Sequence, residues 1–322
     1  MEAIWKVLAP FFADRGYTLW PNGHISMSTS SVDDVSANGY MYDASPFHES
    51  DKSWDSLRPI LSYKSRNALT RAARTSDGRD VVLKVLAIGN QGKEHLEILD
   101  MLARGPYSLI TANHTLPLLE LIVLDDITFG VFPKVGYSCS EMYGGWAKSS
   151  VRDVLEMIVQ CLEALVFLHY SVKVAHRDVF KDNLVIQWLP ETLRAERELT
   201  ASRPRVYMIG FDLAVSFPED SPPEEHRPVA PETLSDKPYD PFKVDVWQLG
   251  MSFSDFKSTI PAIDKVLNSL TDPDPATRPT AYEAMTALLN AVSELPPVSL
   301  LIEPHLEPRR LEPEPGPGPA TP

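Results

Sequence analysis

Residues 176–183 read His-Arg-Asp-Val-Phe-Lys-Asp-Asn, and a strand-like Leu-Val-Ile run follows directly at 184–186. The residues before them predict a buried helix, because Ser150 and Asp153 resemble a capping box and apolar residues recur at helical spacing over 154–168. The sequence therefore places a cation, a carboxylate and an amide on a short loop between a helix and a strand.

Four further motifs flank this loop in a set order. One lies upstream, Val-Val-Leu-Lys at 81–84, and three lie downstream: Ala-Pro-Glu at 230–232, Asp-Val-Trp-Gln-Leu-Gly at 245–250 and Arg-Pro at 278–279. Together with the loop they resemble the motifs of eukaryotic protein kinases, over roughly residues 61–293. More narrowly, the chain resembles divergent kinase-domain proteins common in fungi, in which an N-terminal extension precedes a strand of the Gly-Arg-Asp-Val-Val-Leu-Lys type.

This resemblance implies an α+β class and a bilobal protein-kinase-like fold. A small β-rich lobe is expected up to about Pro133, and a mainly helical lobe is expected after it. The residue patterns predict, for the first lobe, strands at 69–74 and 80–86, a helix at 94–102 and strands at 118–124 and 127–132.

The two ends of the chain differ from the middle. Residues 1–60 predict an N-terminal extension with a short helix interrupted near Pro10 and a mobile Ser-rich linker, and we expect Trp5 and Trp20 to anchor it on the kinase-like domain. Residues 294–322 are rich in Pro and Glu, so they bury too little apolar surface to offset the entropy of ordering. We therefore expect a disordered tail.

Composition excludes several classes of partner. Thirty Lys and Arg against forty-four Asp and Glu give a net charge of −14, which repels nucleic acid and anionic membranes. The longest apolar stretch is short and contains Glu120, so no segment is expected to span a membrane. Cys139 and Cys161 are too far apart in sequence for a zinc or redox pair, and such free thiols favour the cytoplasm or nucleus.

The resemblance implies ATP and Mg²⁺ as cofactors and assigns residues to bind them. Lys84, on its strand, is expected to bind the α- and β-phosphates, oriented by Glu94 or by Glu97 on the next helix. Val135, in the segment that joins the two lobes, is expected to offer its backbone to the adenine.

The loop itself carries the residues expected to act on the substrate. The resemblance implies that Asp178 accepts the proton of a protein hydroxyl and that Asn183 helps to hold the metal ion. His176 and Asp245 are expected to brace the loop and to do no chemistry.

Two charge pairs are expected around the segment that follows. Arg177 is expected to sense charge there, and Glu224 or Glu225 is expected to pair with it in place of a phosphate. Glu232 and Arg278 are expected to form a buried ion pair that supports a peptide-binding segment.

The chain departs from the family at the phosphate and metal sites. Residues 207–214 read Tyr-Met-Ile-Gly-Phe-Asp-Leu-Ala, which puts Gly210 where the metal-binding Asp is expected, and Asp212 is the alternative carboxylate. Residues 62–67, where a glycine-rich loop is expected, contain no glycine, although Lys64 or Arg66 would add positive charge. Phe180 stands where Ser/Thr kinases usually carry Lys, with Lys181 one position on.

Two functions follow from these features, with a third class less favoured. The first is a protein kinase-like phosphotransferase that moves the ATP γ-phosphate to a protein hydroxyl. The second is a pseudokinase that binds nucleotide weakly or serves as a scaffold for a protein partner. Small-molecule kinases share the Asp and Asn of the loop, but the Ala-Pro-Glu motif with Arg278 argues against that class.

Overall fold

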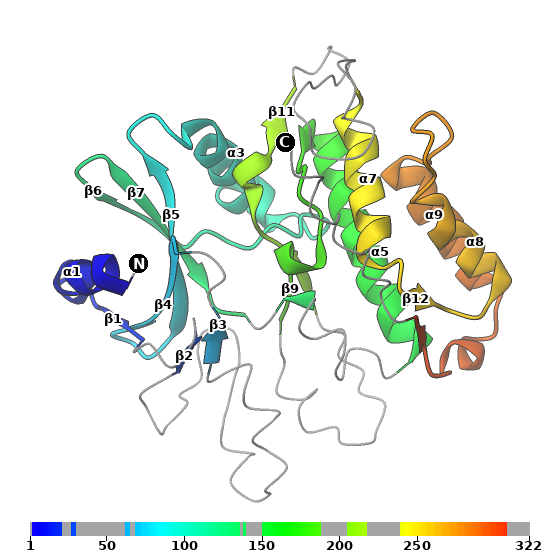
Figure 1. Ribbon diagram of the computed structural model, residues 1–322, viewed down its shortest axis with the longest axis horizontal. Helices are drawn as coiled ribbons and strands as arrows, with labels where there is room; N and C mark the ends of the chain where they lie inside the picture. Colours follow the sequence, from blue (N-terminus) through cyan, green and yellow to red (C-terminus); the bar gives the residue numbers. More distant parts are fainter. Residues whose placement is uncertain are drawn as a thin grey trace, which may run out of the picture.

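The computed structural model describes residues 2–20, 27–29, 62–64, 68–135, 138–139, 150–187, 205–217 and 239–307. Within these residues a five-stranded antiparallel sheet lies on one side of the molecule and a group of helices on the other (Figure 1). This arrangement is compatible with the predicted α+β class. The protein-kinase-like fold itself stays a prediction.

The sheet has the strand order β1 (Tyr17–Leu19), β4 (Thr70–Thr75), β5 (Asp80–Ile88), β7 (Ile127–Pro133) and β6 (Glu120–Leu124). Together with helix α3 (Lys93–Ala103), it confirms the elements predicted for the first part of the chain. The edge strand β1 was not predicted, because three residues are too few to show an alternating pattern.

Short antiparallel pairs complete the strands. They are β2 (Met27–Thr29) with β3 (Ser62–Lys64), β8 (Val174–Ala175) with β11 (Val215–Ser216), β9 (Leu184–Ile186) with β10 (Val206–Met208), and β12 (Phe256–Lys257) with β13 (His305–Leu306).

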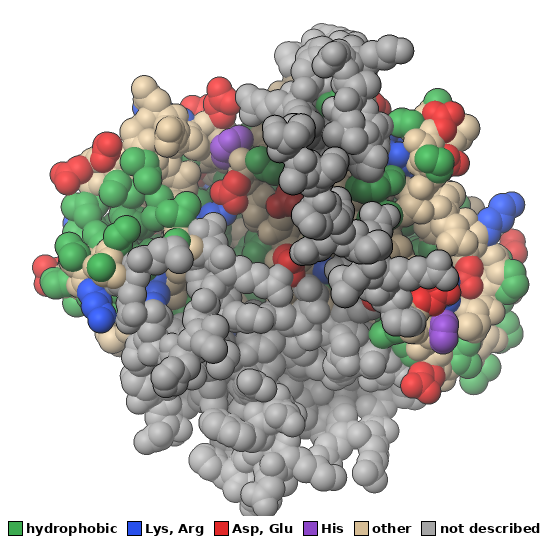
Figure 2. Space-filling view, in the orientation of Figure 1, with side chains coloured by type: hydrophobic (Ala, Val, Ile, Leu, Met, Phe, Trp, Pro, Cys, Tyr) green, Lys and Arg blue, Asp and Glu red, His purple; other side chains and the backbone are tan. Residues whose placement is uncertain are grey.

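Helix α1 (Glu2–Ala13) covers one face of the sheet (Figure 1). Trp5 and Phe12 are buried against Phe129 of β7, and the rings of Phe12 and Phe129 meet edge to face with centroids 5.1 Å apart. Ile4 and Val7 point outward and stay exposed, in the region where Figure 2 shows hydrophobic side chains over α1. The N-terminal helix therefore packs on the sheet, and Trp5 and Trp20, the two expected anchors, are both buried.

The expected interruption at Pro10 is wrong, because α1 continues through it to Ala13. Proline removes one backbone donor from a helix. Here the next turn still closes, since the Asp14 amide donates to the Pro10 carbonyl at 3.0 Å. Burial of the aromatic side chains of α1 outweighs the one lost hydrogen bond.

The helical side is built around α5 (Val151–Val166), which packs against α9 (Ala281–Ser293). The predicted cap is confirmed, because the Ser150 hydroxyl accepts the Asp153 amide at 3.3 Å. Helix α9 begins with a full capping box between Thr280 and Glu283. Helices α7 (Pro241–Ser252) and α8 (Pro261–Ser269) pack against α9.

The expected disorder from residue 294 onward is wrong for residues 294–307. Leu300 is buried, the Val151 amide donates to the Ile302 carbonyl at 2.8 Å, and β13 pairs with β12. Composition averages over a segment, whereas here a few apolar residues meet the end of the helical core. Residues 308–322 lie outside the described part of the chain, as does the predicted linker apart from residues 27–29.

The residues before β6 connect the sheet side to the helical side. The Met208 amide donates to the His114 carbonyl at 2.7 Å, and the Leu116 amide donates to the Met208 carbonyl at 3.2 Å. His114 is buried and also contacts Glu163 of α5 through its Nε2 at 2.9 Å. These contacts fix the sheet relative to β10 and so shape the space between the two sides.

Across the parts that the structure describes, no helix is both long and apolar enough to cross a bilayer.

Phe12→Ala is expected to lower the free energy of unfolding by about 3 kcal/mol, because it leaves a cavity between α1 and the sheet. The matched control is Val7→Ala on the outward face of the same helix, where the side chain is 78% exposed and the change is expected to stay within about 0.5 kcal/mol. Urea denaturation measures both. Equal, small effects would show that α1 does not stabilise the sheet.

Candidate functional site

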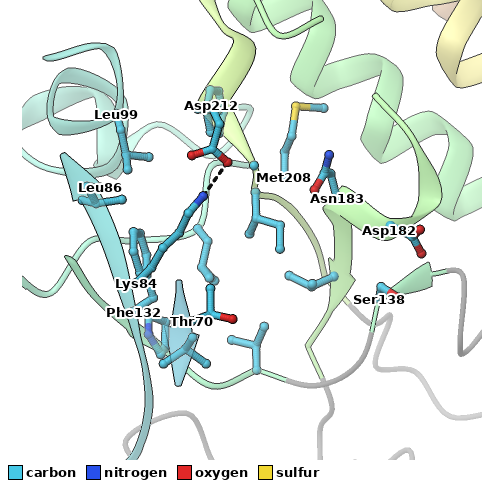
Figure 3. A pocket seen from close by; sticks show the side chains of 18 of the residues that line it. Thr70, Lys84, Leu86, Leu99, Phe132, Ser138, Asp182, Asn183, Met208 and Asp212 are labelled. Carbon is cyan, nitrogen blue, oxygen red and sulfur yellow. Dashed lines mark hydrogen bonds and ion pairs between the residues drawn. The ribbon is translucent and has the colours of Figure 1, made fainter. Parts of the chain in front are cut away.

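A cavity of about 280 Å³ lies between the sheet and the helical side. Its lining comes from β4, β5, α3, β7, the segment after β7, and the residues around β9 and β10. Val82, Phe132, Val135, Val185 and Met208 give it an apolar part. Figure 3 shows Lys84 reaching from β5 across the cavity toward Asp212.

Strand alternation aims Lys84 into this cavity. Val81 and Leu83 face the core under α1, so Val82, Lys84 and Leu86 face the opposite side of the sheet. The Lys84 Nζ donates to Asp212 Oδ2 at 2.6 Å. The lysine side chain is 16% exposed and the aspartate 57%, so the ion pair lies at the mouth of the cavity.

Helix α3 presents His95, Leu96 and Leu99 to the cavity. The helical period of 3.6 residues turns Glu94 and Glu97 away from that face, and both are exposed. The structure therefore does not bring either predicted partner to Lys84. His95 instead contacts the Ala214 carbonyl at 3.2 Å through Nδ1, which must carry the proton because a carbonyl only accepts.

The loop at 176–183 is held by the buried carboxylate of Asp245 in α7. Asp245 accepts the amides of His176 at 2.9 Å and Arg177 at 2.7 Å, and His169 Nε2 lies 2.9 Å from it. Arg177 has a φ of 67°, a left-handed conformation that is costly for a residue with a side chain. Asp245 thus fixes the position of the loop by binding the backbone amides of two loop residues.

Asp178 and Asn183 meet at the end of this loop. The Asn183 Nδ2 donates to Asp178 Oδ2 at 2.6 Å and to the Asp178 carbonyl at 2.9 Å. The Ile209 amide donates to the Asn183 carbonyl at 2.9 Å, so the loop and the residues before Gly210 lie together. Asn183 lines the cavity, and Asp178 is half-buried directly behind it.

His176 is buried in its neutral form. Its Nδ1 accepts the Asp178 amide at 3.2 Å and its Nε2 lies 3.0 Å from the Ile209 carbonyl, a pattern that needs one acceptor and one donor nitrogen. Burial lowers the pKa of His176, and the attraction of Asp245 offsets only part of that effect. The ring also packs against Phe211, with centroids 4.6 Å apart.

Lys181 does not face the cavity. Its side chain is buried and its Nζ donates to Asp255 Oδ1 at 2.8 Å, on the helical side of the molecule. Lys181 therefore does not bring a positive charge to the cavity in place of the lysine expected at position 180.

The segment after β7 carries a buried lysine that sequence reasoning did not single out. Lys134 Nζ lies 5.3 Å from the ring centre of Trp20, and its backbone amide donates to the Asp80 carbonyl at 3.1 Å. Burial lowers the pKa of Lys134 to about 8, and the nearby charge of Asp80 opposes that shift. The predicted Val135 follows it and lines the cavity.

Several predicted residues lie away from the cavity or outside the described part of the chain. The Arg278 guanidinium is buried and donates to the Lys243 and Asp272 carbonyls at 2.9–3.0 Å. Its predicted partner Glu232 lies outside the described residues, as do Arg66, Glu224, Glu225 and the side chain of Lys64.

The described residues offer few ligands for Mg²⁺ in this arrangement. Gly210 brings no carboxylate, Asp212 is paired with Lys84, and Asn183, whose Nδ2 donates to Asp178, offers only its neutral amide oxygen. Asp182 also lines the cavity, but Figure 3 shows it pointing away on the opposite side from Asp212. Among the described residues, no group of three His, Cys, Asp or Glu could hold a metal ion.

Sequence reasoning missed His95 and Asp182 as cavity residues. The helical phase of α3 would have singled out His95, because buried Ile98, Leu99 and Leu102 mark the inner face of that helix. Asp182 gave no separate signal, since it lies inside the motif between Asp178 and Asn183.

No protein-family model matches the chain. The chain is 32% identical over 98 residues to the serine/threonine-protein kinase ppk8 of Schizosaccharomyces pombe, a match that covers 30% of this chain and 18% of that protein. The match therefore spans less than a fifth of the relative, and it supports a kinase-like relationship at most.

Gly210→Ala is expected to lower the free energy of unfolding by about 2–3 kcal/mol. Gly210 has a φ of 82°, and an added Cβ would lie 2.4 Å from Asn183 Oδ1. Gly89→Ala is the matched control, with a φ of 56° and only an ordinary 3.7 Å contact, and it is expected to cost about 1 kcal/mol. If urea denaturation gives equal losses, the contact with Asn183 does not restrict position 210.

Stability is expected to fall as the pH is lowered from 7.5 to 5.5, in part because of His176. An unfolded histidine titrates near pH 6.5 whereas the folded one stays neutral, so the unfolded state binds more protons below that pH. The contribution is at most about 1.4 kcal/mol per pH unit.

His176→Gln is expected to flatten this part of the pH dependence, whereas His305→Gln, at an exposed position, is expected to leave it unchanged. Urea midpoints at three pH values measure the slope. Identical slopes in the wild type and the His176 variant would contradict the assignment.

Proposed function

We propose that the cavity binds ATP and that the protein is a protein kinase-like phosphotransferase acting on a protein hydroxyl. The observation that carries this proposal is that a strand-borne lysine, Lys84, and Asn183 line one cavity, and that Asn183 is hydrogen-bonded to Asp178 behind it. The partial similarity to a serine/threonine kinase supports the same class.

The apolar part of the cavity suits a purine base. Val82, Phe132 and Met208 line it, and Val135 lies beside it on the segment that leaves β7. Phosphates placed next to this part would come within reach of the cation of Lys84, since that side chain crosses the cavity. A rigid strand carries the lysine, so its charge is positioned before a ligand arrives.

Asp178 is the group suited to take the substrate proton. ATP, when bound, supplies the phosphoryl group, and the hydroxyl oxygen replaces the bridging oxygen of the leaving ADP. Asn183 holds one oxygen of the Asp178 carboxylate, and the braced loop fixes its backbone. The second oxygen has no hydrogen bond from the described residues and is suited to accept the proton.

A pseudokinase is the second candidate, and Gly210 is the observation that favours it. No carboxylate stands at that position, and the substitute Asp212 is held by Lys84. Losing a metal carboxylate removes electrostatic stabilisation of the transition state. In that case the protein binds nucleotide and acts through a protein partner.

Asp178→Asn is expected to reduce phosphoryl transfer at least 100-fold, a loss typical of removing a general base, while ATP binding is retained. The measurement uses labelled ATP with Mg²⁺ or Mn²⁺ and a general protein acceptor such as casein, and ATP binding is followed by calorimetry. Asp126→Asn, at an exposed loop position, is the matched control and is expected to leave transfer unchanged.

Each outcome of this experiment selects a function. Transfer that Asp178→Asn abolishes supports the phosphotransferase. ATP binding without transfer in the wild type leaves the pseudokinase. No binding of ATP by the wild type contradicts the phosphotransferase and leaves only a pseudokinase that serves as a scaffold.

A further inference from the structure

We propose that the nucleotide phosphates replace Asp212 as the ion-pair partner of Lys84, so that the nucleotide binds without a divalent cation. This inference rests on the proposed nucleotide site and adds how that site opens. The ligand is the phosphate chain of a nucleoside triphosphate, and the pair of Lys84 with Asp212 is the contact that it replaces.

The two charges of this ion pair differ in burial. Lys84 is fixed by β5 and is mostly buried, so its charge stays at the cavity. Asp212 is more than half exposed, so its carboxylate can turn to water at little cost once it leaves the lysine. A phosphate oxygen then offers the ammonium group a charge-assisted hydrogen bond in place of the carboxylate.

The backbone around Asp212 is held independently of Lys84. Phe211 is buried against His176, and the Ala214 carbonyl is bound by His95 of α3. Release of the carboxylate therefore moves one side chain and leaves the turn Phe211–Leu213 in place. The site opens without detaching the segment from α3.

The residues around Gly210 offer few ligands to a divalent cation. Gly210 brings no carboxylate, and a side chain there would collide with Asn183, so restoring one is resisted by the packing. The Asn183 amide nitrogen donates twice to Asp178, so this side chain offers a cation only its one neutral oxygen. Phosphate charge must then be met by the protein's own cations. Two lysines line the described cavity, and Lys84 reaches its mouth at Asp212, whereas Lys134 is buried beside Trp20.

The test is ATP binding by isothermal titration calorimetry to the full chain, in EDTA and in Mg²⁺, with adenosine as the probe that lacks phosphate. The dissociation constant for ATP is expected to be the same in both buffers within about threefold. Asp212→Asn is expected to tighten ATP binding in EDTA roughly fivefold, the change that loss of a competing exposed ion pair gives. Adenosine binding is expected to stay unchanged.

Two matched variants make the test specific. Asp182→Asn removes the same charge from the same cavity at a carboxylate that does not pair with Lys84, and it is expected to change ATP affinity less than Asp212→Asn. Lys84→Met is expected to weaken ATP binding in EDTA and to leave adenosine binding intact, which also shows that the variant is folded.

The outcomes separate this inference from the proposed function. If ATP binds only when Mg²⁺ is present, the inference is overturned and the nucleotide site stands. If Asp212→Asn and Asp182→Asn act equally, the exchange at Lys84 is overturned. If neither ATP nor adenosine binds in either buffer, the proposed function falls and the inference falls with it.

Discussion

The carboxylate of Asp245 is fully buried, and the arrangement of the loop at 176–183 depends on it. A buried charge is costly unless donors surround it, and here two loop amides and a histidine ring do so. In return the carboxylate holds Arg177 in a backbone conformation that it would not otherwise adopt. The loop thus holds Asp178 and Asn183 hydrogen-bonded to each other, with Asn183 lining the cavity. This geometry is fixed before any ligand binds.

The second organising contact, Lys84 with Asp212, differs in kind because the Asp212 carboxylate is more than half exposed, and it is the contact that we propose a ligand replaces. A surface ion pair contributes little to stability, so a ligand with stronger negative charge can replace it. Buried contacts from His176 and His95 keep the neighbouring backbone in place on both sides of Asp212. The site therefore combines a rigid frame with one side chain that is free to turn, a combination suited to binding an anion.

Much of the fold could be predicted from residue patterns. The strands at β4 to β7 and the helices α3 and α5 follow from alternation, period and a cap, which are local properties. The site was predicted less well. Lys84 and Asn183 come from motifs and both line the cavity, with Asp178 bonded to Asn183 behind it. Glu94 and Glu97 do not reach Lys84, and His95 was missed. Packing against other elements decides which side of a helix faces a cavity. Glu94, His95 and Glu97 lie within one turn of α3, so their order in the sequence does not show which of them faces Lys84.

The sequence by itself determined the order of the motifs, the absence of a carboxylate at Gly210 and the excess of acidic charge, because these depend only on which residue stands where. Only the tertiary structure decided that α1 continues through Pro10 to cover the sheet and that residues 294–307 pack on the helical core. The tertiary structure also decided that Lys84 forms its ion pair with Asp212. These contacts join residues far apart in the chain, and their energies come from burial and charge proximity, which no local pattern records.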